Sequence, residues 1–124
     1  MAKVIVQTNE APIPSSPYSQ AVRSGGFVFV SGQGPLDAKT GEVVGTTIQE
    51  QTAQSLRNVS AILQAAGTSL DRVVSATFIL ADPDDFAGMN EEWARWFPTD
   101  RPARQGAQLP VRGIKISIAV IAEA

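Results

Sequence analysis

An arginine set among small residues is the first group in this sequence that could carry chemistry. Residues 101–110 read RPARQGAQLP, and no acidic residue stands within three positions of Arg104. Its neighbours Ala103, Gly106 and Ala107 leave room for a ligand beside the guanidinium group, whose planar fork binds a carboxylate through two parallel hydrogen bonds. The alternative is an arginine at the surface or at an interface, where most charged residues lie.

Two further segments carry polar groups that could line a binding site. Tyr18, the only tyrosine in the chain, follows the three prolines of a loop at 10–20, and these prolines hold the backbone extended. Ser31 and Gly32 end an apolar run, where a glycine lets a ligand approach backbone N–H and C=O groups. The alternatives are a hydrophobic anchor with a satisfied hydroxyl for Tyr18 and a β-bulge or turn for Ser31 and Gly32.

The chain contains no cysteine and no histidine. Their absence excludes disulfides, thiolate nucleophiles, Ser-His-Asp triads and almost every zinc or iron site. No glycine-rich phosphate-binding motif occurs either. Any chemistry must therefore use arginine, tyrosine, serine, carboxylates, backbone groups and water, and we expect neither a metal nor a cofactor.

Length and charge narrow the class of protein further. The chain has 124 residues, the size of one domain, which we place at 1–124. A formal charge of −2 and a pI near 5.0 give no basic surface for nucleic acid. No apolar run approaches the length of a membrane span, and the first residues are too polar for a signal peptide. We therefore expect a soluble, cytoplasmic protein that binds neither nucleic acid nor membranes.

Apolar periodicity and turn residues predict two helices among several strands. Thr47 and Glu50 form a capping box, and Gly67 is typical of a helix end. Asp82 and Pro83 begin the second helix as N-cap and first residue. The predicted strands are 4–7, two runs within 21–36 joined by a turn, a short edge strand within 37–44, 72–80, 103–109 and 114–122.

The second helix carries an apolar stripe that we expect to face the core. The stripe consists of Phe86, Met89, Trp93 and Phe97. Asn90 lies beside it, and an amide near a core face needs hydrogen-bond partners. We favour a bond to a neighbouring loop over a ligand contact.

The alternation of helices and strands predicts an α+β fold with both helices packed on one face of a mixed sheet. The other face is then open, and apolar strand residues would make it a large bare patch. The candidates are Val28, Val30, Phe78, Ile116, Ile118 and Val120. Such a patch is unusual on a soluble monomer, so we expect a homo-oligomer that buries it.

Six motifs, spread in order along the chain, together resemble the RidA/YjgF family of reactive-intermediate (enamine/imine) deaminases. They are P-x-P-x-x-P-Y-S-Q-A at 12–21, F-V-F-V-S-G-Q at 27–33, N-V-x-A-I-L-x-A-A-G at 58–67, F-x-x-M-N-x-x-W at 86–93, R-P-A-R at 101–104 and K-I-x-I-x-x-I-A at 115–122.

The resemblance implies a chorismate-mutase-like α+β fold and a homotrimer, with three sheets forming a central barrel and ligand clefts between subunits. It implies that Arg104 grips the carboxylate of a 2-aminoacrylate-type enamine or imine. Tyr18, Ser31 and Gly32 would line the same cleft, and Asn90 would lie near it. Arg104 and Tyr18 are the expected catalytic groups. The family's reaction gives a 2-keto acid and ammonia without a cofactor.

Two positions depart from the family pattern. Ala119 stands where the family has a glutamate that orients the attacking water, and Gly106 replaces a frequent cysteine. Loss of a general base typically costs about 10²–10⁴-fold in rate. The sequence therefore leaves three functions open. The first is a weakened or retargeted imine deaminase, and the second is a non-catalytic binder of small carboxylates or keto acids in the same cleft. The third is a deaminase for an aminomuconate-like enamine, in a cleft that Gly106 and Ala119 would enlarge. RNA cleavage, also described for the family, gains no support from the low pI and the absence of histidine.

Overall fold

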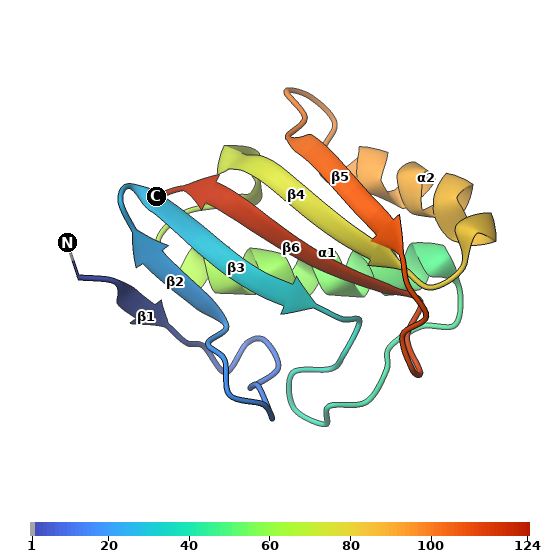
Figure 1. Cartoon of the computed structure of the whole chain (residues 1–124), viewed down its shortest axis with the longest axis horizontal. Coiled ribbons are helices and arrows are strands. Elements are labelled where there is room, and N and C mark those ends of the chain that lie inside the picture. Colours follow the sequence, from blue (N-terminus) through green and yellow to red (C-terminus); the bar gives the residue numbers. More distant parts are fainter. Residues whose placement is uncertain (1) are drawn as a thin grey trace.

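Six strands form one mixed sheet, and two α-helices lie against a single face of it (Figure 1). The computed structural model describes residues 2–124. The strand order is β1-β2-β3-β6-β4-β5, and every neighbouring pair is antiparallel except β4 and β5. The elements are β1 (Val4–Val6), β2 (Ala21–Ser24), β3 (Phe27–Gln33), α1 (Ile48–Ala65), β4 (Val73–Leu80), α2 (Phe86–Trp96), β5 (Ala103–Gln108) and β6 (Ile116–Glu123). Two 3₁₀ turns, η1 (Leu70–Arg72) and η2 (Pro83–Asp85), precede β4 and α2.

The first helix begins and ends as its sequence predicts. The backbone N–H of Glu50 donates to Thr47 Oγ1 (3.1 Å), and the N–H of Thr47 donates to Glu50 Oε1 (3.0 Å), which completes the capping box. Gly67 follows the helix with φ of 86°, a conformation that favours glycine. The apolar stripe of α1 is buried against β3 and β6.

The second helix begins later than predicted. Asp82 Oδ1 accepts from the N–H of Asp84 (2.9 Å), but this cap starts the 3₁₀ turn η2, and α2 itself begins at Phe86. Met89, Trp93 and Phe97 are buried as expected, whereas Phe86 is 45% exposed, so its assignment to the core was wrong. Its ring lies 6.1 Å from that of Phe78 and lines a cavity together with residues 106–108 of β5.

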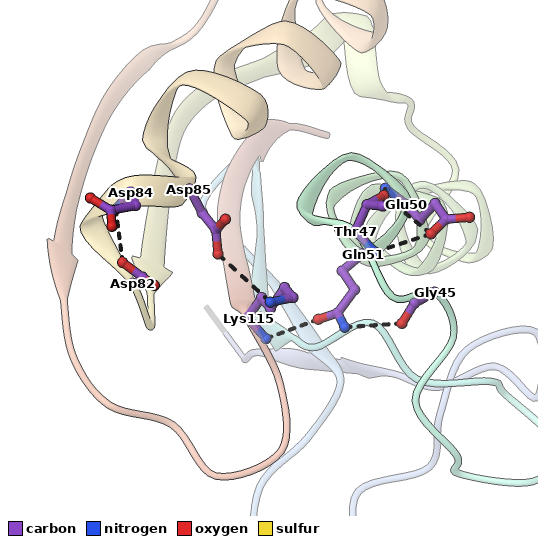
Figure 2. Close-up of polar contacts among 8 residues, drawn as sticks. All are labelled: Gly45, Thr47, Glu50, Gln51, Asp82, Asp84, Asp85 and Lys115. Carbon is purple, nitrogen blue, oxygen red and sulfur yellow. Dashed lines mark hydrogen bonds and ion pairs between the residues drawn. The ribbon is translucent and has the colours of Figure 1, made fainter.

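A polar network fixes the start of α2 relative to the sheet (Figure 2). Gln51 on α1 donates from Nε2 to the carbonyl of Gly45 (3.1 Å), and its Oε1 accepts from the backbone N–H of Lys115 (2.9 Å). Lys115 Nζ lies 4.0 Å from Asp85 Oδ2 in η2. Since Gln51 is buried, its two hydrogen bonds connect α1 to the segment before β6, and the longer contact of Lys115 with Asp85 adds η2 to the network.

The sheet faces are the reverse of the prediction. All six residues predicted to lie on the open face are buried and point towards the helices. The open face carries the alternate residues instead, and its exposed aromatic rings are Phe27 and Phe29. Both sets of alternating positions at the start of β3 are apolar, Phe27 and Phe29 on one face and Val28 and Val30 on the other, so a period of two cannot tell there which set faces the core. The open face still carries exposed apolar side chains, as expected, but these include Phe27 and Phe29 and none of the six predicted residues.

The predicted edge strand within 37–44 is also wrong. Only an isolated bridge joins Leu36 and Val43. Asp37 Oδ1 accepts from the backbone N–H groups of Thr40 (2.9 Å) and Lys39 (2.8 Å), which closes a tight turn and lowers the pKa of the Asp37 carboxyl. Within residues 2–124, neither helix has the length and apolarity needed to cross a lipid bilayer.

Candidate functional site

Arg104 lies on the helix-facing side of the edge strand β5. It pairs in register with the buried Ala76 of the parallel strand β4, so its side chain points towards α2. Its guanidinium carbon is 5.0 Å from the ring centre of Trp93, 5.1 Å from that of Phe78 and 5.8 Å from that of Phe86. Three aromatic rings therefore hold the cation in place.

No carboxylate neutralises this guanidinium. Within residues 2–124 the ion pairs are Arg95–Glu92 and Lys115–Asp85, and neither involves Arg104. Partial burial lowers the pKa of Arg104 from its ordinary value, although an arginine stays charged at neutral pH. A fixed, partly desolvated cation without an internal partner is suited to bind an anionic ligand.

Arg104 and Asn90 line the same small cavity, between α2 and the start of β5. Its volume is about 260 Å³, which suits a small organic acid better than a nucleotide or a drug-sized ligand. The lining residues are Asn90, Trp93, Ala94, Arg101, Pro102 and Arg104. Of the site residues predicted from the sequence, two line this cavity, Arg104 and Asn90.

Gly106 lies two residues further along β5, opposite Phe78. A Cβ atom placed on Gly106 would overlap the Phe78 ring, so the missing side chain leaves no open space above this residue. Gly106 instead contributes to the wall of a neighbouring apolar cavity of about 330 Å³. At its own Cα, Gly106 opens no space, because the Phe78 ring fills that volume, and its role in the ligand cleft stays a prediction.

Tyr18, Ser31 and Gly32 lie far along the sheet from Arg104. Tyr18 precedes β2 and the other two are in β3, whereas Arg104 is in β5, with β6 and β4 between β3 and β5. Tyr18 is 52% exposed on the loop before β2. The hydroxyl of Ser31 donates to the carbonyl of Ser19 (2.7 Å), which holds this loop against β3. Buried Gln20 stiffens the loop further, because its Nε2 lies within hydrogen-bond distance of three backbone carbonyls in 8–12.

Ala119 faces the open side of the sheet, close to Ser117 on the same strand. A Cβ on Gly32 would lie 2.9 Å from Ser117 Oγ, so this part of β6 borders the segment of Ser31 and Gly32. Ala119 itself lines a shallow cavity of about 230 Å³ without any ionisable group. The lining residues are Phe29, Val30, Ser75, Thr77, Gln105, Ala119, Val120 and Ile121.

The predicted site residues therefore form two groups within one chain. One group contains Arg104, Asn90 and Gly106, on the helix-facing side at one end of the sheet order. The other contains the segment from Tyr18 to Gln20, Ser31–Gly32 and Ala119. Strands β6 and β4 lie between β3 and β5, and Ala119 and Arg104 project from opposite faces. A single chain does not bring both groups to one ligand.

Sequence reasoning missed two residues around Arg104, one in the wall of its cavity (the arginine cavity) and one that packs against its guanidinium group. Arg101 lines the same cavity as Arg104, and its Nε donates to the carbonyl of Phe97 at the end of α2 (2.7 Å). Phe78 was assigned to the open face, whereas its ring supports Arg104. The paired arginines of R-P-A-R were the only available signal for Arg101. Nothing in the sequence indicates that β5 pairs with β4.

A larger cavity, of about 810 Å³, lies elsewhere as an open groove between α1 and the loops at 8–10 and 37–39. None of the predicted residues lines it, and its charged residues are of both signs: Glu10, Asp37, Lys39 and Arg57. Within residues 2–124, no three acidic side chains cluster as metal ligands would. The chemistry of the chain therefore points to the smaller arginine cavity.

Fold and site together define an α+β protein with a small cavity, lined by two arginines, between its second helix and an edge strand. Residues 8–124 match the family described as endoribonuclease L-PSP. The chain belongs to this family, and the resemblance to RidA/YjgF proteins is confirmed.

Relatives and solved structures agree with this assignment. A RutC family protein of Pyrococcus horikoshii is 48% identical over 107 residues, which cover 86% of this chain and 85% of that protein. The mouse 2-iminobutanoate/2-iminopropanoate deaminase is 40% identical over 121 residues, covering 95% of this chain and 89% of that one. The crystal structure of Escherichia coli TdcF with bound serine superposes with a TM-score of 0.91 at 36% identity, covering 98% of both chains.

Proposed function

We propose that this protein hydrolyses reactive enamine and imine acids of the 2-aminoacrylate type to 2-keto acids and ammonia. Two kinds of evidence support the proposal. Relatives that match most of this chain are named as imine deaminases, and Arg104 offers an unneutralised cation for the carboxylate that such substrates carry. The orientation of Arg104 by three aromatic rings is the observation that carries the assignment.

The proposed reaction needs positioning more than strong activation. The enamine CH₂=C(NH₂)–COO⁻ first tautomerises to the imine CH₃–C(=NH)–COO⁻. Water then adds to the imine carbon, so that a C–O bond forms and the nitrogen takes up a proton. The carbinolamine breaks its C–N bond, ammonia leaves, and the hydroxyl loses its proton to give pyruvate. A carboxylate held on Arg104 presents the imine carbon in one orientation. This positioning lowers the barrier to the addition of water.

We further propose that the active site is shared between copies of the chain in a homotrimer. Arg104 and Ala119 lie on opposite faces of one sheet, so only a second copy can bring the equivalent of Ala119 to the arginine cavity. The open face supports association, because Phe27 (40% exposed) and Phe29 (43% exposed) leave apolar rings in solvent. A cytoplasmic location stays a prediction from the sequence.

The group that activates water is not the family's glutamate in this chain. The surroundings of Ala119 contain hydroxyl and amide groups, including Thr77 and Gln105, which bond each other at 3.2 Å. In the proposed trimer, the phenol of Tyr18 is the other candidate for proton transfer. Either group is a weaker base than a carboxylate at neutral pH. We therefore propose slower turnover than a glutamate-bearing relative would show.

A second function is supported by the same alanine. Without a general base, the cleft could bind small carboxylates or keto acids without turning them over. This proposal predicts saturable binding that depends on Arg104, and no acceleration of imine hydrolysis. The aminomuconate-type deaminase has less support, because Phe78 occupies the space that Gly106 was expected to open.

A coupled assay separates the proposed functions. A pyridoxal-phosphate dehydratase generates 2-aminoacrylate from serine, and pyruvate release is followed with and without this protein. Faster pyruvate release, proportional to protein concentration, supports the deaminase. Rates equal to the control without protein would refute it. Saturable pyruvate binding measured by calorimetry in that case would establish the binding protein instead.

A further inference from the structure

A second arginine lines the arginine cavity, and a simple imine acid leaves its charge unused. Arg101 and Arg104 both line it, and the remaining lining residues, Asn90, Trp93, Ala94 and Pro102, are uncharged. The cavity therefore carries a formal charge of +2 and no negative group of its own. A substrate with one carboxylate neutralises only half of this charge.

Arg101 is held in place without being neutralised. Its Nε donates to the carbonyl of Phe97 at 2.7 Å, which fixes the guanidinium plane at the C-terminal end of α2. A guanidinium group has five N–H donors, and this bond uses one of them. Within residues 2–124, no carboxylate lies within 4.0 Å of Arg101. The four Nη donors are left for a ligand or for water.

Arg101 and Arg104 are exposed side chains of like charge on the wall of one small cavity, and a dianion can pair with both at once. We propose, building on the deaminase function above, that the preferred substrates are imines of dicarboxylic acids. The carboxylate next to the imine carbon binds Arg104, and the distal carboxylate binds Arg101. The volume of about 260 Å³ favours short diacids over larger ones. Hydrolysis then gives a 2-keto dicarboxylic acid and ammonia by the balanced steps already described, and the second carboxylate takes no part in bond breaking.

A binding experiment tests this preference independently of turnover. The probes are 2-oxoglutarate and 2-oxopentanoate, which share a five-carbon chain and a keto acid group and differ in the distal carboxylate. Isothermal titration calorimetry on the intact oligomer measures both affinities for four proteins. These are the wild type, Arg101→Gln, Arg101→Lys and Arg112→Gln, the last being a control at an exposed arginine outside the cavity.

The wild type should bind the diacid about 10- to 100-fold more tightly, the worth of one charge-assisted bidentate contact. Arg101→Gln should remove this preference, because the affinity for 2-oxoglutarate should fall to about that for 2-oxopentanoate. Arg101→Lys should retain part of it, because the charge stays, and Arg112→Gln should retain all of it. Equal affinities in the wild type, or a preference that survives Arg101→Gln, would overturn the proposal.

A parallel rate measurement keeps this inference separate from the proposed function. An amino-acid oxidase generates the imines of 2-oxoglutarate and 2-oxopentanoate in place, and ammonia release is followed. Faster release from the diacid imine that depends on Arg101 supports both proposals. Acceleration of the two imines to the same extent overturns only the diacid preference. Diacid-selective binding with no acceleration of either imine overturns the deaminase and leaves the dianion site standing.

Discussion

The ring of Phe78 occupies the volume that a side chain on Gly106 would take. The two residues face each other across the parallel pair β4 and β5, and the same ring lies 5.1 Å from the guanidinium carbon of Arg104. A large residue on one strand and the smallest on its neighbour therefore form one packing unit. This unit supports the cation from the side of the core.

Gly106→Cys tests this packing unit. The new side chain overlaps Phe78, and overpacking of this kind typically costs about 1–3 kcal/mol. We expect a loss of that size in the free energy of unfolding, measured by urea denaturation. Phe78→Val should relieve the overlap, so the double variant Phe78→Val/Gly106→Cys should be more stable than the sum of the two single changes predicts. Strict additivity would show that the two side chains do not compete for this space.

The capping box of α1 gives a pH-dependent stability prediction. Backbone N–H groups of Thr47 and Thr46 donate to Glu50 and lower the pKa of its carboxyl from the ordinary 4.5. The group therefore stabilises the fold fully above pH 4.5, and its contribution is lost as the pH falls through the lowered pKa. Denaturation of wild type and Glu50→Gln should differ most at pH 7 and converge in acid. A difference that grows on acidification would contradict this assignment.

Thr47→Ala removes the other half of the same box. Loss of an N-cap hydroxyl typically costs about 1 kcal/mol. Its effect on stability should not change between pH 6 and pH 8, because no group of the box titrates there. Thr99→Ala, at an exposed threonine before β5, is a matched threonine control. An equal loss in both variants would show that the effect is not specific to the helix cap.

Phe29 on the open sheet face tests self-association. Phe29→Ser removes an exposed ring beside Ala119, and we expect it to shift the oligomer towards monomer in light scattering coupled to size exclusion. Val43→Ser is the control, since Val43 is equally exposed but lies outside the sheet. A monomeric wild type, or an oligomer unchanged by Phe29→Ser, would exclude this face as the interface.

Ala119→Glu tests the missing base. If the proposed cleft lacks only a carboxylate, this change should raise the turnover of 2-aminoacrylate by about 10²–10⁴-fold. Ala119→Gln has nearly the same shape without a titratable group and should give little increase. An increase with both variants would assign the effect to the shape of the cleft. No increase with either would place the proton transfer elsewhere.

The outcome of the sequence predictions follows from what each pattern encodes. Capping residues and helical periodicity act locally, so both helices were predicted, although α2 begins at Phe86. The prediction assigned the two faces of the strands the wrong way round. Phe27 and Phe29 are as apolar as Val28 and Val30, so the alternation does not show which pair faces the helices. Arg104 and Asn90 were candidates from their residue types. Their shared cavity depends on the β4–β5 pairing and on the approach of α2, which are tertiary relationships.

The most direct test of the central claim is the kcat/KM of Arg104→Lys on 2-aminoacrylate in the coupled dehydratase assay. Lysine keeps the positive charge but loses the planar pair of donors, so we predict a fall of about 10- to 100-fold. The oligomeric state should stay that of the wild type, and Arg112→Gln should keep full activity. A kcat/KM for Arg104→Lys equal to that of the wild type would contradict the binding of the substrate carboxylate by Arg104.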